Sequence, residues 1–226
     1  MFLLCLIDNR VMTKTVFKWA VVGAGPAGIA AIGCLLDQGI DPDKILWLDP
    51  DFKVGDLGRY WQTISSNTRV RLFLDFLNAC PSFAFQAAHQ EFTLQQFDPD
   101  DTCKLRYIVE PLQWITKTIQ KTIQFSEDFI HELKLSDRRW HLKGDNAVYQ
   151  AKNVILATGA EAETLNYPGI EAVPFELAMN QEKLRQFVTQ SDTYAVFGSS
   201  HSAVIALNYL VDLGVHKIIN FYRSPC

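Results

Sequence analysis

The stretch AVVGAGPAGIAAIGCLLDQG, residues 20–39, decides the fold, because an apolar run breaks there into three glycines spaced G-x-G-x-x-G. β-Branched and aromatic side chains dominate residues 16–22, which predicts a buried strand leading into the glycines. Pro26 suits the first turn of a helix, and apolar residues then recur at helical spacing as far as Leu36. The run ILWL at 45–48 predicts a second buried strand. The sequence therefore predicts a β-α-β unit.

Each glycine of the motif has its own role in a dinucleotide-binding turn. Gly23 permits the tight turn, Gly25 lets a pyrophosphate approach the backbone, and Gly28 lets helix and strand pack closely. The helix start attracts phosphates, and Asp49, after the second strand, can accept hydrogen bonds from a ribose diol. The residues predicted to bind this first dinucleotide are Gly23, Gly25, Pro26, Ala27, Gly28, Asp49 and Pro50.

The composition is that of a globular protein and argues against several classes of partner. Of the 226 residues, 48% are hydrophobic and 20% are charged, with a net charge of −4. No run of Lys and Arg occurs, so neither nucleic acid nor an anionic membrane surface is expected as a partner. No apolar stretch approaches the roughly 20 residues that span a bilayer.

The cysteines indicate neither a disulfide framework nor a metal site. The chain has 5 cysteines, widely spaced and without a C-x-x-C pair: Cys5, Cys34, Cys80, Cys103 and Cys226. We therefore expect incidental thiols in a reducing, cytoplasmic compartment, and no metal ligands.

The middle of the chain predicts a helix followed by a small antiparallel sheet. Residues 110–124 have apolar positions at helical spacing, with Pro111 in the expected first turn. The segments 129–136, 138–144 and 147–151 alternate and are separated by polar turns, which predicts a three-stranded meander. A further apolar strand, 154–157, then ends in a turn formed by Thr158 and Gly159.

This order of elements resembles the flavoprotein oxidoreductases with two dinucleotide-binding domains, the pyridine nucleotide-disulfide oxidoreductase superfamily. The resemblance implies that the first unit holds FAD and that the turn at Thr158 and Gly159 closes over the same site. The expected fold class is α/β, a Rossmann-like doubly wound FAD-binding domain with a small antiparallel β-meander, followed by the start of a second Rossmann-like NAD(P)-binding domain. The expected divisions are an N-terminal extension at 1–14, with Met12 as an alternative start, an FAD-binding domain at 15–165, and the beginning of an NAD(P)H-binding domain at 166–226.

Within that superfamily, residues 55–76 resemble the flavin-containing monooxygenases. The matching positions are Gly58, Trp61, Asn67, Thr68, Asp75 and Phe76. The resemblance implies that Asn67 lies beside the reactive flavin ring, as a catalytic and cofactor-binding residue, and that Gly58 and Trp61 also bind the cofactor. In the alternative interpretation residues 65–68 form a turn and Trp61 is a packing residue. The usual monooxygenase motif before the second glycine loop is absent, which leaves monooxygenation and the substrate class open.

Residues 195–214 repeat residues 20–39 with a constant shift of 175 positions. Gly198 matches the first glycine, while serine and alanine replace the other two. The position of Asp49 is taken by Tyr222, so no carboxylate repels a 2′-phosphate, and the Arg223 guanidinium can bind one. We therefore expect NADPH rather than NADH, although Arg223 could instead be a solvated charge. His201 has either a catalytic role or a contact with solvent or phosphate. The residues predicted to bind the second cofactor are Gly198, Ser199, Ser200, Ser202, Arg223 and Ser224.

These features together predict an FAD-dependent oxidoreductase that takes hydride from NADPH. Monooxygenation of a small-molecule substrate and reduction without oxygenation are both open, and the third alternative is a truncated, non-catalytic dinucleotide-binding remnant. The sequence ends directly after the second strand of the repeat, so we expect a truncated chain that binds FAD weakly. We also expect its strand at 218–222 to be exposed and to favour a homo-oligomer.

Overall fold

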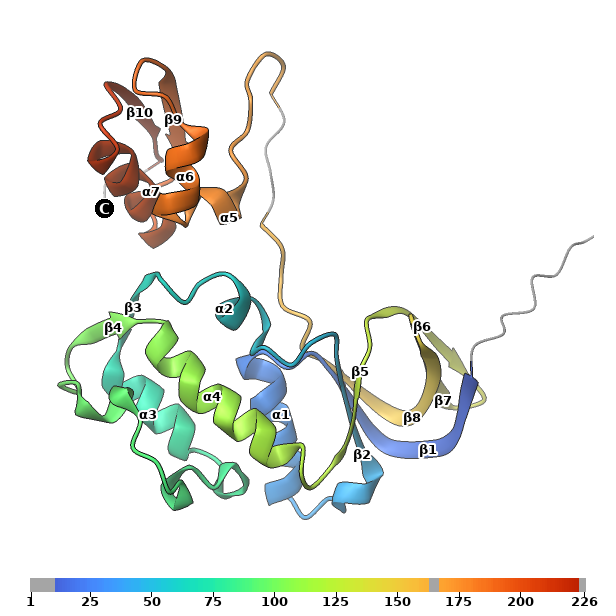
Figure 1. Cartoon of the computed structure of the whole chain (residues 1–226). Coiled ribbons are helices and arrows are strands. Elements are labelled where there is room, and N and C mark those ends of the chain that lie inside the picture. Colours follow the sequence, from blue (N-terminus) through green and yellow to red (C-terminus); the bar gives the residue numbers. More distant parts are fainter. Residues whose placement is uncertain (1–10, 163–166, 224–226) are drawn as a thin grey trace, which may run out of the picture.

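The computed structural model describes residues 11–162 and 167–223, which form a larger and a smaller part (Figure 1). The larger part contains a six-stranded sheet of order β5-β2-β1-β8-β7-β6. Its strands are β1 (Val11–Val22), β2 (Ile45–Asp49), β5 (Gln124–Glu127), β6 (Ile130–Ser136), β7 (Arg139–Gly144) and β8 (Ala147–Leu156). A short antiparallel pair consists of β3 (Ser65–Arg69) and β4 (Thr102–Lys104).

The sheet joins a parallel half to an antiparallel half through β8. Strand β1 pairs in parallel with β2 and with β8, whereas β6, β7 and β8 form the predicted antiparallel meander. The prediction of a separate strand at 154–157 was wrong, because β8 is continuous from Ala147 to Leu156. The reason is that β1 hydrogen-bonds along both ends of β8, while β7 pairs only with its first half. The third strand of the meander and the strand that precedes the turn at Thr158 and Gly159 are therefore one strand, β8.

Strand β1 is longer than the sequence pattern predicted. It begins at Val11, which pairs with Ala147, so the strand starts inside the expected 1–14 extension. The register between β1 and β8 shifts between Met12 and Val16. The predicted boundary at 165/166 lies outside the described residues, as does Ser224.

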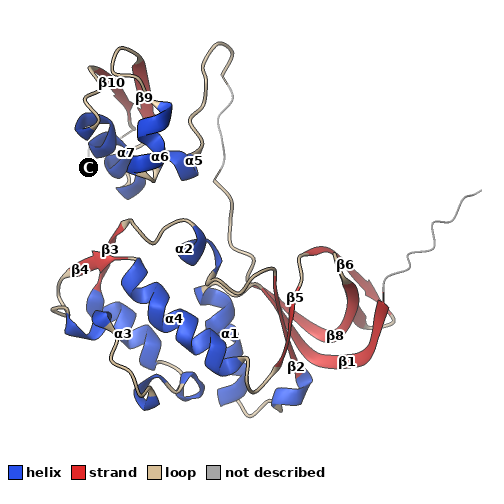
Figure 2. Ribbon diagram, in the orientation of Figure 1, coloured by secondary structure: helices blue, strands red, loops and turns tan. Residues whose placement is uncertain are grey.

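Helices cover one face of the central strands β1 and β2, and the meander curves over their other face. The helices are α1 (Pro26–Asp37), α2 (Gly55–Arg59), α3 (Val70–Asn78) and α4 (Arg106–Ile119), with short 3-10 turns η1 (Pro42–Lys44), η2 (Pro81–Phe83), η3 (Phe85–Ala87) and η4 (Thr93–Gln96). In Figure 2, α1, α3 and α4 gather on one side of β1 and β2, and β6–β8 curve away on the other.

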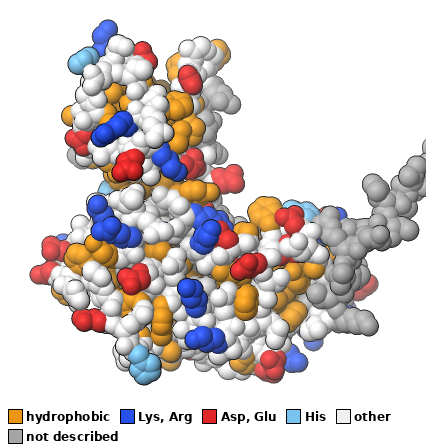
Figure 3. Space-filling view, in the orientation of Figure 1, with side chains coloured by type: hydrophobic (Ala, Val, Ile, Leu, Met, Phe, Trp, Pro, Cys, Tyr) orange, Lys and Arg blue, Asp and Glu red, His pale blue; other side chains and the backbone are white. Residues whose placement is uncertain are grey.

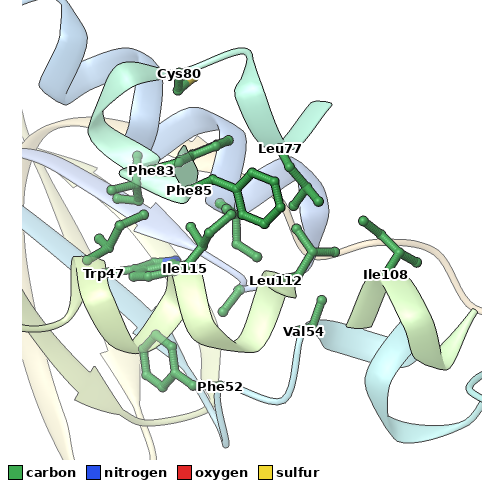
Figure 4. Close-up of a cluster of buried hydrophobic side chains, with 14 of the residues drawn as sticks. Trp47, Phe52, Val54, Leu77, Cys80, Phe83, Phe85, Ile108, Leu112 and Ile115 are labelled. Carbon is green, nitrogen blue, oxygen red and sulfur yellow. The ribbon is translucent and has the colours of Figure 1, made fainter. Parts of the chain in front are cut away.

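Alternating side chains of the central strands serve two separate cores. Val21 and Trp47 point into the helix-side core, whereas Ala20 and Leu48 point into the core formed with the meander. Figure 4 shows the helix-side core, in which Trp47 lies close to aliphatic residues of α4. Because both faces are covered, β2 is buried along its whole length, which explains its unbroken apolar run.

Helix α4 begins earlier than predicted, so the placement of Pro111 in its first turn was wrong. The helix starts at Arg106, and Pro111 lies inside it. The N–H groups of Leu105 and Arg106 donate to the carbonyls of Ile64 and Gln62, which fixes the helix start at this earlier point. These two hydrogen bonds join segments that are far apart in the sequence, so the local sequence pattern could not predict where α4 begins.

The smaller part reproduces the first β-α-β unit. It comprises α5 (Phe175–Ala178), α6 (Gln181–Phe187), β9 (Thr193–Phe197), α7 (His201–Asp212) and β10 (Lys217–Phe221), and β9 pairs in parallel with β10. Gly198 has φ +115° where Gly23 has φ +108°, and the N–H of each donates to the neighbouring strand at 2.7 Å. A side-chain N–H, from Trp47 or from Asn220, binds the carbonyl of that glycine at 2.9 Å in both copies. The internal repeat is therefore a repeat of structure, and the predicted α/β Rossmann-like class is confirmed.

The surface shows charges of both signs. In Figure 3 basic and acidic side chains are interspersed over the visible face, and apolar side chains lie between them. Among the residues that the structure describes, no helix has the length and apolar character needed to cross a membrane.

The packing of Gly28 predicts a large cost for any side chain at this position. A Cβ there would overlap the carbonyl oxygen of Gly23, which is backbone and cannot move aside. We expect Gly28→Ala to lower the free energy of unfolding by about 2–3 kcal/mol, measured by urea denaturation. Gly39→Ala is the matched control, since that glycine has φ +74° but open space around it, and it should cost only about 1 kcal/mol. Equal losses in the two variants would contradict the role assigned to Gly28.

Candidate functional site

The glycine turn creates an open space at the start of α1. Gly23 is fixed by packing, because a Cβ there would overlap the carbonyl of Ala157 at the end of β8. Gly25 differs from its neighbours: the nearest atom to a Cβ would be the Cα of Gly55, at 4.0 Å. The first and third glycines are therefore required by the protein's own backbone, and the second leaves room for a ligand.

Most of the predicted first-site residues surround a single cavity at this turn. Its volume is about 520 Å³, and the predicted residues that line it are Gly23, Gly25, Pro26, Ala27, Asp49, Pro50, Thr158 and Gly159. Pro26 occupies the first helical position and Gly25 the N-cap. The N–H groups in the first turn of a helix have no intrahelical acceptor, so they are available to a phosphate.

Asp49 holds the cavity together and keeps one acceptor position open. Its carboxyl group is 4% exposed, and Oδ1 accepts hydrogen bonds from the N–H groups of Asp51 and Phe52 at 3.0 and 2.7 Å. Oδ2 accepts one hydrogen bond, from the N–H of Ala24 at 2.8 Å. A carboxylate oxygen can accept two, so Oδ2 can also take a ribose hydroxyl. Asp49 thus fixes the glycine loop and remains suited to the predicted role.

Arg59, which the sequence analysis did not single out, is the basic side chain of this region. Its guanidinium binds Asp51 in bidentate fashion at 3.0 and 2.8 Å and lies 3.5 Å from Asp56 and 3.7 Å from Asp49. The hydrogen bond from Arg59 lowers the pKa of Asp51, and Asp51 in turn raises the pKa of Arg59. Among the described residues that line the two cavities, Arg59 is the one Lys or Arg. The signal in the sequence was an arginine between Gly58 and Trp61, close to a cluster of aspartates.

The far wall of the cavity is apolar. Phe129 and Leu156 line it and are 56% and 58% exposed, so an aromatic ring of a ligand could pack against them. Asp128, next to Phe129, is 3% exposed. Its carboxylate accepts hydrogen bonds from the N–H of Asn146 and, at 3.0 Å, from the Tyr149 hydroxyl, and so holds this part of the chain in place. Burial raises the pKa of Tyr149, which keeps it a hydrogen-bond donor. The residues present therefore fit an elongated dinucleotide with an anionic centre and flat apolar ends.

A second cavity, of about 660 Å³, lies between the larger and the smaller part. It contains Trp61 and Ser202 from the predicted set, together with Arg59, His201 and Phe175. The Trp61 ring meets the ring of Phe175 edge to face at 5.4 Å, so Trp61 has a packing role between the two parts. His201 Nε2 lies 2.9 Å from the carbonyl oxygen of Ser65, which also joins the two parts.

Asn67 and Gly58 are not among the residues that line the first cavity. Asn67 is an exposed residue of β3 and is not among the residues that line either cavity. The N–H of Thr68 donates to Ser66 Oγ at 2.8 Å, and the β3–β4 register is irregular at this point. Gly58 is explained by packing, since a Cβ there would overlap the carbonyl of Lys53.

The second glycine loop is only partly brought to a cavity. Ser200 is the N-cap of α7, and Ser202 alone of the predicted second set lines a cavity. Gly198 and Ser199 precede the helix, and Arg223 is exposed just after β10. Ser224 lies outside the described residues. Within residues 11–162 and 167–223 no group of three His, Cys, Asp or Glu side chains is placed to hold a metal ion.

Comparison with known protein families shows to which family this chain belongs. The sequence pattern of the family described as "Pyridine nucleotide-disulphide oxidoreductase" matches residues 20–224. The chain belongs to this family. The superfamily predicted from the order of elements is thereby confirmed.

Individual members of the family give further detail. The chain is 32% identical over 214 residues to the monooxygenase AgnR1 of Paecilomyces divaricatus, covering 85% of this chain and 54% of that protein. The chain thus spans about half the length of that curated relative. Among solved structures it resembles the bacillithiol disulfide reductase of Staphylococcus aureus (TM-score 0.62, 15% identity, 93% of this chain and 58% of that one). It also resembles OTEMO in complex with FAD and NADP (TM-score 0.62, 14% identity, 94% and 40%). At these identities the two structures show the fold.

The position of Arg59 predicts a measurable role in binding an anionic dinucleotide. Without its charge, Asp49, Asp51 and Asp56 would surround the open space at Gly25 uncompensated. We expect Arg59→Ala to raise the Kd for FAD at least about tenfold, measured by flavin fluorescence titration, and Arg59→Lys to give an intermediate value. Arg71→Ala is the control, because Arg71 is half-exposed and binds Asp100 instead. Unchanged FAD binding by Arg59→Ala would refute this role.

The same ion pair predicts a specific pH dependence of stability. The pKa of Asp51 is lower in the folded chain than in the unfolded chain, so the pair stabilises the fold above the ordinary carboxyl pKa of about 4. This stabilisation is lost as the pH falls through the lowered pKa. The difference in unfolding free energy between the wild type and Asp51→Asn should therefore be constant near neutral pH and shrink in acid. Urea denaturation over a pH series measures it, with the exposed Asp192→Asn as control. A difference that grows in acid would contradict the prediction.

Proposed function

We propose that this chain contains an FAD-binding unit and an NADPH-binding unit of a flavin-dependent monooxygenase that acts on a small molecule. The observation that carries the proposal is the open space at Gly25, at the start of α1, within a cavity that also contains Asp49 and an apolar wall. The relatedness to a monooxygenase over 85% of the chain supports oxygenation as the outcome.

When bound, FAD supplies the hydride acceptor and the ring that reacts with oxygen, and the protein supplies binding and orientation. The first turn of α1 would donate hydrogen bonds from its N–H groups to the pyrophosphate, and Asp49 Oδ2 would accept a hydrogen bond from a ribose hydroxyl. Arg59 offsets the negative charge shared by the pyrophosphate and the nearby aspartates. Trp61 and Phe175 form an aromatic wall of the cavity between the two parts. Asn67, which is exposed on β3, is the residue proposed to act beside the flavin ring.

The second β-α-β unit is proposed to bind NADPH. Its glycine turn has the geometry of the first, and Ser200 and Ser202 place hydroxyl groups near the start of α7. Tyr222 stands where a carboxylate would repel a 2′-phosphate, and Arg223 follows as a cation that can bind one. The proposed division has one change from the sequence-based one: the FAD domain begins at Val11, with β1, and continues to 165, and the NADPH unit occupies 166–226.

Two alternative functions compete with this proposal. A flavin-dependent reductase without oxygenation is supported by 34% identity over 101 residues to a thioredoxin reductase of Coxiella burnetii. Against a thiol-based reductase, none of the described cysteines lines either cavity. The other alternative is a dinucleotide-binding remnant without catalysis, which would bind cofactor but not transfer hydride.

The proposal also covers partners and compartment. A small molecule is the expected substrate, and the net charge of −4 gives no reason to expect nucleic acid. Phe197 and Phe221, about half exposed and stacked at 5.0 Å, provide a surface for a homo-oligomer. The thiols of Cys34, Cys80 and Cys103 are free, which fits the reducing conditions of the cytoplasm.

Hydride transfer and oxygenation are tested in two steps on the purified chain loaded with FAD. Under anaerobic conditions NADPH should bleach the flavin absorbance, and in air an oxygenated flavin should accumulate before peroxide is released. Bleaching without this species would favour the reductase, and no bleaching would favour the remnant.

The cofactor preference is tested separately, by the binding of 2′,5′-ADP and 5′-AMP. Arg223→Ala should weaken binding of 2′,5′-ADP about tenfold and leave 5′-AMP unchanged. Arg185→Ala, an exposed arginine of α6, is the matched control. Equal affinity of the wild type for the two probes would overturn the preference for NADPH.

A further inference from the structure

The last turn of α1 is tied to the loop that follows α3, at a place remote from both cavities. The carboxylate of Asp37 accepts a hydrogen bond from the N–H of Ser82 at 3.0 Å and another from the Ser82 hydroxyl. The N–H of Phe83 donates to the carbonyl of Cys80 at 3.0 Å and so closes η2. These bonds hold Cys80 against α1.

Two cysteines meet at this junction. A Cβ added at Gly33 would lie 3.0 Å from both Cβ and Sγ of Cys80, so the sulfur packs on the helix backbone next to Cys34. Figure 4 shows Cys80 near Phe83 at the margin of the core. Cys34 is exposed, whereas Cys80 is buried. Cys34 and Cys80 lie far apart in the sequence, so the cysteine spacing that predicted incidental thiols gives no sign of this contact.

The two thiols differ in character. Burial, then the neighbouring Cys34, then Asp37 raise the pKa of Cys80 to about 12, so it is a protonated thiol at neutral pH. Cys34 is an exposed residue of α1. An accessible sulfur with a protected thiol beside it is the arrangement in which an oxidised cysteine is resolved by its neighbour.

We propose that Cys34 and Cys80 form a peroxide-reactive dithiol that closes to a disulfide between α1 and η2. The Cys34 thiolate attacks a peroxide oxygen; an S–O bond forms, the O–O bond breaks, and hydroxide leaves. Cys80 then attacks the sulfenic sulfur of Cys34; the S–S bond forms, the S–O bond breaks, and the departing hydroxide takes the Cys80 proton as water. Both sulfurs are oxidised and the peroxide is reduced to two waters.

Neither cysteine lines a cavity, so the disulfide would not touch a bound cofactor. Any effect on cofactor binding would be transmitted through α1. The disulfide would join the C-terminal end of the helix whose first turn carries Gly25 to the segment after α3. A disulfide restricts the unfolded chain and thus favours the folded domain. The oxidant is hydrogen peroxide supplied from outside, so the outcome does not depend on the proposed flavin chemistry.

The test is peptide mapping of the full chain after treatment with hydrogen peroxide. Trypsin places Cys34 in residues 19–44, but Cys80 and Cys103 share residues 72–104, so a second cleavage after Glu91 is needed to separate them. We expect a reducible link between Cys34 and Cys80, which dithiothreitol removes. Cys103→Ser is the matched control, since Cys103 is also a buried free thiol and its loss should leave the link unchanged.

A second measurement uses stability. Oxidation should raise the midpoint of thermal unfolding by about 5 °C, and the rise should vanish on reduction and in Cys34→Ser, a substitution at an exposed position that should not impair folding. Cys34 oxidised to the sulfinic acid without a link would overturn the proposal. A link of Cys34 to another chain or to Cys103 would overturn it as well.

Discussion

The structure depends on a stack of backbone contacts at the glycine turn. Gly28 packs directly on the carbonyl of Gly23, and Gly23 packs on the carbonyl of Ala157 at the end of β8. Through these contacts α1 lies close to the sheet, β8 pairs with β1, and the meander that continues β8 covers the second face. The cavity lies at Gly25, between these two glycines, where an added Cβ would meet nothing closer than the Gly55 Cα at 4.0 Å.

Electrostatics sets the character of that cavity. Three aspartates lie within 3.7 Å of the Arg59 guanidinium, and Asp49 is further held by three backbone N–H groups. A buried carboxylate is tolerated there because hydrogen bonds and a cation compensate it. The same residues therefore fix the loop after β2 and prepare a site for a group with both hydroxyls and phosphates.

The two copies of the β-α-β unit show which of its features are shared and which differ. Both keep the positive φ of the first glycine and the side-chain hydrogen bond to its carbonyl, from Trp47 or from Asn220. The second copy has Ala203 where the first has Gly28, and a Cβ at Gly198 would meet the Ala203 Cβ at an ordinary 3.8 Å. The helix of the second copy thus accepts a methyl group, and the start of this helix contributes His201 and Ser202 to the second cavity. Turn geometry is shared by the copies, while helix packing and the ligand site are not.

The sequence by itself determined the β-α-β units, the meander and most of the first cavity, because glycine spacing and hydrophobic periodicity are local signals. The same signals misplaced the start of α4 and divided β8, since both depend on hydrogen bonds to distant segments. Only the tertiary structure decided that Arg59 faces the cavities, that Asn67 is exposed on β3, and that Cys34 meets Cys80. These outcomes depend on which surfaces pack against each other after the chain has folded, and side-chain spacing along the chain carries no record of such contacts.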